Sequence, residues 1–211
     1  GYVSSAQELL HQFENKGLCP KLIVLSTGSA GTHAGMVAGF HALDCDIPIM
    51  GISVRQLEEI QIDNVYKLAV KTAALLTDKP LSRDKVLVDD GYVGEGYGIP
   101  TDGTLAAINT VARNEGILLD PVYSGKGMAG LIGQIENGQI SSDGEVVFLH
   151  TGGAVSLFAY EDQFLAEIIS LFPSNRVFLF RGISCSTGTA TTTTITTTTS
   201  STMSASSTTT T

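Results

Sequence analysis

Tryptophan is absent from this chain of 211 residues, and cysteine is scarce. The three cysteines, Cys19, Cys45 and Cys185, lie far apart and form no CxxC pair. Such spacing indicates neither a zinc site nor a disulfide framework, so no metal is expected. Free thiols suit a reducing compartment, and we expect a cytoplasmic protein.

Long apolar runs and positive charge are also lacking. No stretch is apolar over the length that crosses a membrane, and no secretory signal peptide opens the chain. The formal net charge of −9 argues against nucleic-acid binding, because such proteins present a basic face. A small anionic ligand is not excluded, since it responds to the local field rather than to total charge. The first residues already follow a helical pattern, so we expect a truncated beginning.

Two kinds of apolar pattern alternate along the chain, in which 43% of the residues are hydrophobic. Runs of helical period predict helices over residues 2–16, 32–43, 57–76, 101–115 and 126–135. Short apolar runs predict strands over residues 21–25, 47–54, 86–88 and 145–149. This alternation favours an α/β fold, a parallel sheet with flanking helices and right-handed crossovers. Ser4 or Ser5 is expected to cap the first helix, and Gly17 to end it.

The stretch from Leu22 to Gly35 combines a buried strand, a turn rich in glycine and hydroxyls, and a helix that begins near Thr32. A helix start leaves backbone N–H groups without partners and carries partial positive charge, which suits a phosphate. The candidate phosphate-binding residues are Thr27, Gly28, Ser29, Ala30, Gly31 and Thr32. The pattern is neither a Walker loop nor the dinucleotide fingerprint. A tight turn whose hydroxyls only cap the helix is the alternative.

Other turns rich in polar residues fall at the same end of the predicted sheet. In a parallel α/β sheet, ligands bind beyond the carboxyl ends of the strands. The turns concerned cover residues 26–32, 89–97, 123–124 and 150–153. Tyr97 and Tyr123 lie in two of them and are candidate acid–base or stacking residues, with simple packing as the alternative.

Four segments resemble motifs of one enzyme family and occur in the family's order. They are Ser26-Thr-Gly-Ser-Ala-Gly-Thr-His-Ala-Gly35, Gly96-Tyr-Gly-Ile-Pro100, Asp120-Pro-Val-Tyr-Ser-Gly-Lys-Gly-Met-Ala-Gly130 and His150-Thr-Gly-Gly-Ala154. The family comprises D-cysteine desulfhydrases and 1-aminocyclopropane-1-carboxylate (ACC) deaminases, which are pyridoxal-phosphate (PLP) enzymes of the tryptophan-synthase β-like fold. The resemblance covers about residues 1–160, which would be the C-terminal part of the PLP-binding domain.

The rest of the chain is foreign to that family. Residues 161–183 stay unassigned. Residues 184–211 are dominated by threonine and serine, with alanine and glycine, and offer little apolar surface to bury. We expect them to form a disordered, low-complexity tail that is not part of the domain.

The resemblance implies pyridoxal 5′-phosphate as the cofactor, with its phosphate held by residues 27–32. It also implies a small amino-acid substrate, near which Tyr97 and Tyr123 would act as catalytic residues. Ser124 and Thr151 would bind the cofactor at its pyridine ring. For D-cysteine, β-elimination in this family yields pyruvate, sulfide and ammonia. Deaminases of the family carry Glu directly after the tyrosine and lack the threonine, so Ser124 and Thr151 favour the desulfhydrase, with ACC deaminase as the alternative.

One departure from the family pattern concerns the Schiff-base lysine, which the family carries far upstream of the phosphate turn. Lys16 and Lys21 precede the turn without a matching motif, and neither is assigned that role. The resemblance therefore implies a fragment that is inactive alone, although its full-length parent is a lyase and, as is common in the family, a homodimer. A non-catalytic protein that binds PLP or another phosphate ligand is the alternative of a different class.

Overall fold

The computed structural model describes residues 1–141 and 143–164. The tail predicted over residues 184–211, and most of residues 161–183, lie outside the described residues. The elements named below belong to one unit, Gly1–Ile168. None of the helices in the described ranges is long and apolar enough to cross a bilayer.

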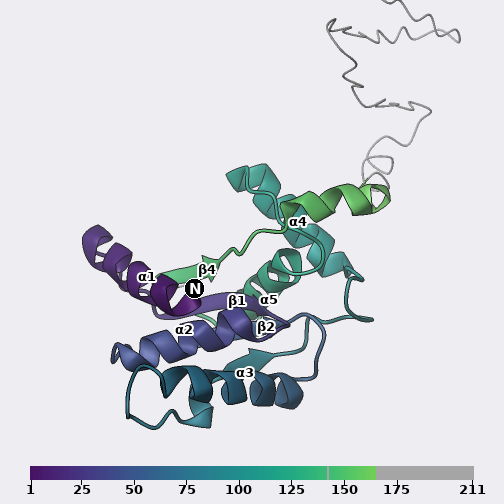
Figure 1. Cartoon of the computed structure of the whole chain (residues 1–211). Coiled ribbons are helices and arrows are strands. Elements are labelled where there is room, and N and C mark those ends of the chain that lie inside the picture. Colours follow the sequence, from purple (N-terminus) through teal and green to yellow (C-terminus); the bar gives the residue numbers. More distant parts are fainter. Residues whose placement is uncertain (142, 165–211) are drawn as a thin grey trace, which may run out of the picture. The chain divides into compact units, whose positions relative to one another are not determined.

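The chain forms a four-stranded parallel sheet flanked by helices (Figure 1). In chain order the helices and strands are α1 (Tyr2–Lys16), β1 (Leu22–Thr27), α2 (Gly31–Ala42), β2 (Ile49–Ser53), α3 (Glu58–Ala73), β3 (Leu87–Asp89), α4 (Asp102–Glu115), α5 (Ser124–Glu136) and β4 (Val146–Leu149). Two 3₁₀ helices cover Arg83–Lys85 and Ala154–Tyr160. The strand order is β3-β2-β1-β4, so the predicted α/β fold with a parallel sheet is confirmed.

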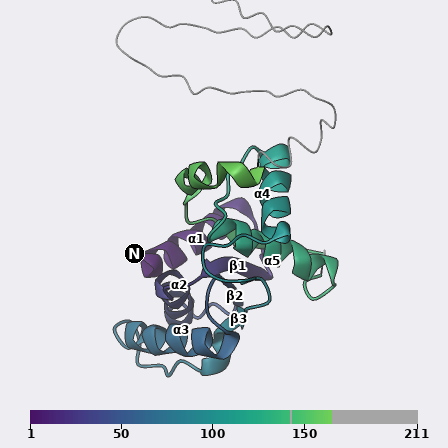
Figure 2. The ribbon, with the colours of Figure 1, turned by 90° about the vertical axis from the view of Figure 1, so that its right-hand side faces the viewer.

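Successive side chains of a strand point to opposite faces, and β1 shows how this divides the core. Ile23 and Leu25 are fully buried in a cluster with residues of α1, α2 and α3. Val24 is fully buried in a second cluster, with Ile52 of β2 and Leu131 of α5. Figure 2 shows α2 and α3 on one side of the strands and α5 on the other. Helix α4 packs against α5.

Four predicted boundaries move by two or three residues, and one of them is the end of β1, which reaches Thr27 instead of Leu25. The strand predicted over residues 47–54 begins only at Ile49, because Pro48 has no N–H to offer the ladder and contributes its carbonyl oxygen to the amide of Ile23. The helix predicted over residues 57–76 ends at Ala73. Helix α5 begins at Ser124 and not at Lys126, because the turn that precedes it already has the geometry of a helix start.

The helix ends test the capping predictions. The expected cap of α1 by Ser4 or Ser5 is wrong, since the helix begins at Tyr2 and Ser5 lies inside it. Gly17 ends α1 in the left-handed conformation, with φ of 64°, as predicted. Thr101 caps α4, where its side chain accepts a hydrogen bond from the amide of Thr104.

Candidate functional site

The four strands are parallel, so their carboxyl ends meet at one side of the sheet, which we call the carboxyl edge. The turns that leave this edge cover residues 28–30, 54–57, 90–98 and 150–153. The start of α5 joins them, because the Ser26 hydroxyl at the end of β1 donates to the Tyr123 carbonyl oxygen at 2.8 Å. The predicted convergence of these turns therefore exists in the structure.

Helix α2 begins directly after the glycine-rich turn and has no side-chain cap. Its N-cap residue, Ala30, adopts a left-handed conformation with φ of 69°, which is uncommon for a residue other than glycine. Capping of α2 by the turn's hydroxyls, the alternative to phosphate binding, is therefore wrong. The first amides of α2 have no carbonyl partner within the helix, and they stand beside the exposed Ser29 and the half-buried Thr32. An uncapped start of this kind suits an anion.

Thr27 has a different environment from the rest of the phosphate turn. It is buried, and its Oγ1 accepts a hydrogen bond of 2.8 Å from Nε2 of Gln61 in α3. Gln61 is itself fully buried, although it comes from a helix whose sequence pattern gave no sign of a functional residue. Thr27 thus supports the turn from the protein interior, while Ser29 and Thr32 face outward.

Gly28 lies directly beneath Tyr123. A Cβ placed at Gly28 would come within 2.8 Å of the Tyr123 hydroxyl oxygen and 2.9 Å of Cγ2 of Val54. Only glycine fits this close approach without displacing one of them. The tertiary structure therefore brings the predicted tyrosine and the predicted phosphate turn together, although 95 positions separate them in the sequence.

Tyr97 and Arg55 complete this aromatic cluster. The rings of Tyr97 and Tyr123 meet edge to face, with centroids 5.9 Å apart and planes at 84°. The Arg55 guanidinium lies 5.7 Å from the centroid of the Tyr97 ring. Burial, followed by interactions with Tyr97, raises the pKa of Tyr123, and Arg55 opposes the rise. The Tyr123 hydroxyl is therefore protonated at neutral pH.

Arg55 was not among the predicted site residues. It follows β2 at the carboxyl edge, in a turn that the sequence analysis passed over because it holds no glycine or hydroxyl motif. Its place directly after a parallel strand was the one signal available.

A buried carboxylate orders the turn that carries Tyr123. Asp120 is 3% exposed, and its Oδ2 accepts hydrogen bonds from the amides of Val122 and Tyr123 at 2.9 and 2.7 Å. Its Oδ1 accepts from the amide and the hydroxyl of Ser124 at 2.8 and 2.6 Å. Hydrogen bonds to a carboxylate are stronger than those between neutral groups, so this turn is tightly fixed. The sequence indicated Asp120 as part of a motif but not as its organiser.

Asp120 links the segments of the two hydroxyl residues expected at the pyridine ring. Ser124 is buried, and its hydroxyl both donates to Asp120 Oδ1 and accepts from the Asp120 amide at 2.7 Å. Thr151 is exposed in the turn after β4. In the same turn, a Cβ on Gly153 would meet Asp120 Oδ1 at 2.8 Å, so the turn packs closely on Asp120. Ser124 and the turn of Thr151 are thus neighbours through Asp120.

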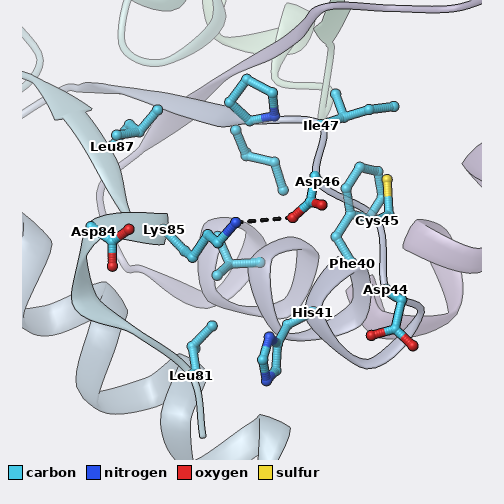
Figure 3. A pocket seen from close by; sticks show the side chains of 13 residues that line it. Phe40, His41, Asp44, Cys45, Asp46, Ile47, Leu81, Asp84, Lys85 and Leu87 are labelled. Carbon is cyan, nitrogen blue, oxygen red and sulfur yellow. Dashed lines mark hydrogen bonds and ion pairs between the residues drawn. The ribbon is translucent and has the colours of Figure 1, made fainter. Parts of the chain in front are cut away.

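A cavity of about 340 Å³ opens at the opposite edge of the sheet (Figure 3). Its walls are the end of α2 and the segments that lead into β2 and β3, where Lys85 and Asp46 form an ion pair of 3.0 Å. Ligands of parallel α/β sheets bind at the carboxyl ends of strands, and this cavity lies at the amino ends. We therefore do not include it in the candidate site.

Residues 1–152 match the family described as pyridoxal-phosphate dependent enzyme, and the chain belongs to that family. The resemblance inferred from the four motifs is thereby confirmed. The curated relatives of this chain include the D-cysteine desulfhydrase of Serratia proteamaculans (strain 568). The two are 39% identical over 163 residues, which make up 77% of this chain and 49% of the relative. The D-cysteine desulfhydrase of Salmonella typhi is 43% identical over 161 residues, 76% of this chain and 48% of the relative.

Solved structures give the same fold. The crystal structure of an ACC deaminase homologue superimposes with a TM-score of 0.69 at 33% identity, over 78% of this chain and 48% of that one. The chain shares the fold alone with a fungal L-serine ammonia-lyase from Rhizomucor miehei. The TM-score is 0.53 and the identity 18%, over 79% of this chain and 55% of that one. The chain spans about half the length of the curated relatives it matches.

Proposed function

We propose that this chain is the cofactor-binding part of a PLP-dependent lyase that acts as a D-cysteine desulfhydrase. The observation that carries the proposal is the Tyr123 hydroxyl, which lies against Gly28 beside the uncapped start of α2. A proton donor next to a phosphate-binding helix start is what a cofactor with a phosphate and a reactive ring requires.

The residues of the carboxyl edge fit PLP. The free amides at the start of α2, with the Ser29 and Thr32 hydroxyls, supply donors for the phosphate. Thr151, which is exposed, would face the pyridine ring, and Ser124, whose hydroxyl is bonded to Asp120, would lie beside it. When bound, PLP supplies an electron sink for chemistry at the substrate α-carbon.

The chain's own residues supply the protons and the orientation. Tyr123 keeps a proton on its hydroxyl at neutral pH, because burial raises its pKa. Asp120 fixes the backbone of Tyr123 by accepting a hydrogen bond from its amide. The Tyr97 ring packs edge to face against the Tyr123 ring and so restricts its movement. Tyr123 is therefore positioned to give or take a proton beside the phosphate turn, and Tyr97 to keep it there.

D-cysteine is the proposed substrate for two reasons. The first reason is that Ser124, directly after Tyr123, and Thr151 both carry hydroxyl groups. A hydroxyl does not hold the pyridine nitrogen protonated as a carboxylate would. A thiolate is a good leaving group and departs readily without a protonated pyridine nitrogen. Two relatives named D-cysteine desulfhydrase also share 39% and 43% of their aligned residues with this chain. The likeness to an ACC deaminase homologue, at a TM-score of 0.69, supports ACC deaminase as the second candidate.

A chimeric enzyme tests the proposal. The part of the Salmonella typhi desulfhydrase that this chain does not span is joined ahead of Gly1, and the product is assayed with D-cysteine and with ACC. We expect pyruvate and sulfide from D-cysteine to form faster than 2-oxobutanoate from ACC. Tyr123→Phe should lower kcat by about 10²- to 10⁴-fold, as expected for loss of an acid–base group. Tyr66→Phe, on α3, removes a hydroxyl that donates to the Leu81 carbonyl oxygen; it is the matched control and should keep full activity.

Each other outcome has a clear meaning. Faster conversion of ACC would make the protein a deaminase. Binding of PLP without reaction of either substrate would favour the non-catalytic binding protein. An unchanged kcat in Tyr123→Phe would remove Tyr123 from the catalytic residues.

We also propose a cytoplasmic location and a homodimeric parent. The location is supported by Cys19 and Cys45, which are free thiols in the described part of the chain, one exposed and one half-buried. The dimer is supported by the family resemblance, and sedimentation of the chimera tests it. A monomer at all concentrations would contradict it.

A further inference from the structure

Lys126 is a buried lysine without a buried acid beside it. It lies in the first turn of α5 and is 0% exposed. Its Nζ donates to the carbonyl oxygens of Val93 and Gly96 at 2.5 and 2.7 Å. Within residues 1–141 and 143–164, no ion pair joins it to a carboxylate.

The position is unfavourable for a positive charge. An ammonium loses its hydration when it is buried, and here no counter-ion compensates that loss. The start of a helix also carries partial positive charge, which repels a cation in its first turn. Burial accordingly lowers the pKa of Lys126. A methionine would fill the same space without this cost, so the presence of lysine is best explained by what its ammonium holds.

The ammonium holds a loop with few hydrogen bonds of its own. Residues 91–98 are rich in glycine, and Gly94 and Gly98 adopt positive φ angles of 67° and 78°. Two backbone bonds brace the segment, from the Val93 amide to Asp90 and from the Ile99 amide to Gly96. Its two ends are held by Asp89, which accepts from the Gly91 amide, and by the Tyr160 hydroxyl, which donates to the Gly98 carbonyl oxygen. Lys126 adds two hydrogen bonds to α5 in the middle of this loop, at the carbonyl oxygens of residues 93 and 96.

The loop carries one of the two site tyrosines. Tyr97 directly follows Gly96, whose carbonyl oxygen Lys126 binds, and its ring meets Tyr123 edge to face at 5.9 Å. Lys126 and Tyr123 are three residues apart at the start of α5, so one short segment positions both tyrosines.

We propose that Lys126 is a positioning residue whose ammonium ties the glycine-rich loop to the start of α5 and so sets Tyr97 against Tyr123. Its importance for catalysis rests on the proposed lyase function, whereas the tie itself does not. The two parts are therefore tested by separate measurements.

Amide hydrogen exchange of the intact chain tests the tie. In Lys126→Met, the amides of Val93 and Ile99 should exchange about tenfold faster or more, while the amides of the sheet keep their rates. Lys71→Met, which removes an exposed lysine from α3, is the matched control and should leave both amides unchanged. Unchanged loop protection in a folded Lys126→Met protein would overturn the proposal.

Chemical rescue separates the ammonium from simple packing. In Lys126→Ala, added propylammonium should restore protection of the two amides, whereas tetramethylammonium, which has no N–H to donate, should not. Equal effects of both ions, or of neither, would count against a tie made by N–H donors. Should Lys126→Met fail to fold, Lys126→Gln keeps a donor and should show intermediate protection; protection as low as in Lys126→Ala would contradict the proposal.

Activity of the chimera tests the catalytic part. Lys126→Met should lower kcat for D-cysteine by about tenfold or more while PLP absorbance shows an unchanged cofactor content. Failure of the unsubstituted chimera to act on D-cysteine would refute the proposed function alone, because loop protection is measured without substrate. An unchanged kcat together with a loosened loop would refute the positioning role.

Discussion

His33 is a fully buried histidine in the first turn of α2, directly behind the phosphate turn. Neither ring nitrogen makes a hydrogen bond of good geometry within the described residues, although the Ile49 backbone lies near the ring. The Nδ1 of His33 lies 2.5 Å from the point where a Cβ on Gly51 would sit. Burial lowers the pKa of His33 to about 4, against a smaller opposing effect of the Ile49 backbone. The ring is therefore neutral at physiological pH and packs as an aromatic spacer.

Stability should depend on pH through His33. The unfolded chain binds a proton on this residue below pH 6.5, whereas the folded chain does so only below about 4. The free energy of unfolding should therefore fall as the pH drops from 6.5 to 4, by about 3 kcal/mol from this group. His33→Leu should flatten that part of the curve, and urea titrations at several pH values measure it. The exposed His11→Leu is the control, and an equal flattening there would contradict the assignment.

Ser124 and Thr151 are the residues that we propose set the choice between desulfhydrase and deaminase. In the chimera, Ser124→Glu combined with Thr151→Leu should shift the ratio of rates from D-cysteine toward ACC. Ser124 is buried against Asp120, so like-charge repulsion should turn the new carboxylate away from Asp120. The ratio of 2-oxobutanoate to pyruvate formed is the measurement. A folded double variant with an unchanged ratio would show that these residues do not set the choice.

At the scale of elements, β1, the turn after it and α2 form the part of the molecule that we propose binds an anion. The turn needs small residues because two other elements approach it closely, Val54 after β2 and Tyr123 before α5. It needs a left-handed residue, Ala30, because the chain reverses there to enter α2 without a side-chain cap. The donors left free at α2 follow from both requirements.

Gly28→Ala should therefore weaken cofactor binding. The added methyl group would overlap the Tyr123 hydroxyl at 2.8 Å, and displacing that side chain should cost about 1–3 kcal/mol of stability. We expect PLP affinity of the chimera to fall about tenfold or more, measured by equilibrium dialysis. Gly103→Ala, in the first turn of α4 and open to solvent, is the control and should keep the affinity. Equal affinities in both variants would remove Gly28 from the site.

At the scale of the whole molecule, the chemistry gathers at one edge of the sheet. Parallel strands deliver four turns to the carboxyl edge, and α5 adds the segment with Asp120 and Tyr123. The lysines described in this chain include no residue that the family motifs identify as the Schiff-base lysine. The chain thus combines a proposed phosphate site and a proposed ring site without an assigned covalent anchor.

This chain alone should bind PLP weakly and reversibly. The phosphate donors at the start of α2 are present, so PLP should bind more tightly than pyridoxal, which lacks the phosphate. Absorbance titration compares the two compounds, and dialysis should remove either. After borohydride reduction, mass spectrometry should find no single lysine labelled in high yield. Specific labelling of one lysine would show that the anchor lies within these residues.

The sequence by itself determined the main helices and strands and the parallel sheet, and it predicted the two main parts of the candidate site. Apolar periodicity and glycine-rich turns are local signals, and they located β1, α2 and the phosphate turn within a few residues. The motif around Tyr123 was also visible because its residues are adjacent in the chain. These predictions needed no knowledge of which segments touch.

Only the tertiary structure decided which distant side chains meet. Gln61 binds Thr27, Arg55 stands over Tyr97, and Lys126 binds the loop that carries Tyr97, all across gaps of about 30 residues or more. The same structure decided against the alternative of a hydroxyl cap and left the start of α2 free. Side-chain partners depend on the register of the sheet and the packing of helices on it, and neither leaves a periodic signal in the sequence, because many pairings satisfy the same apolar pattern.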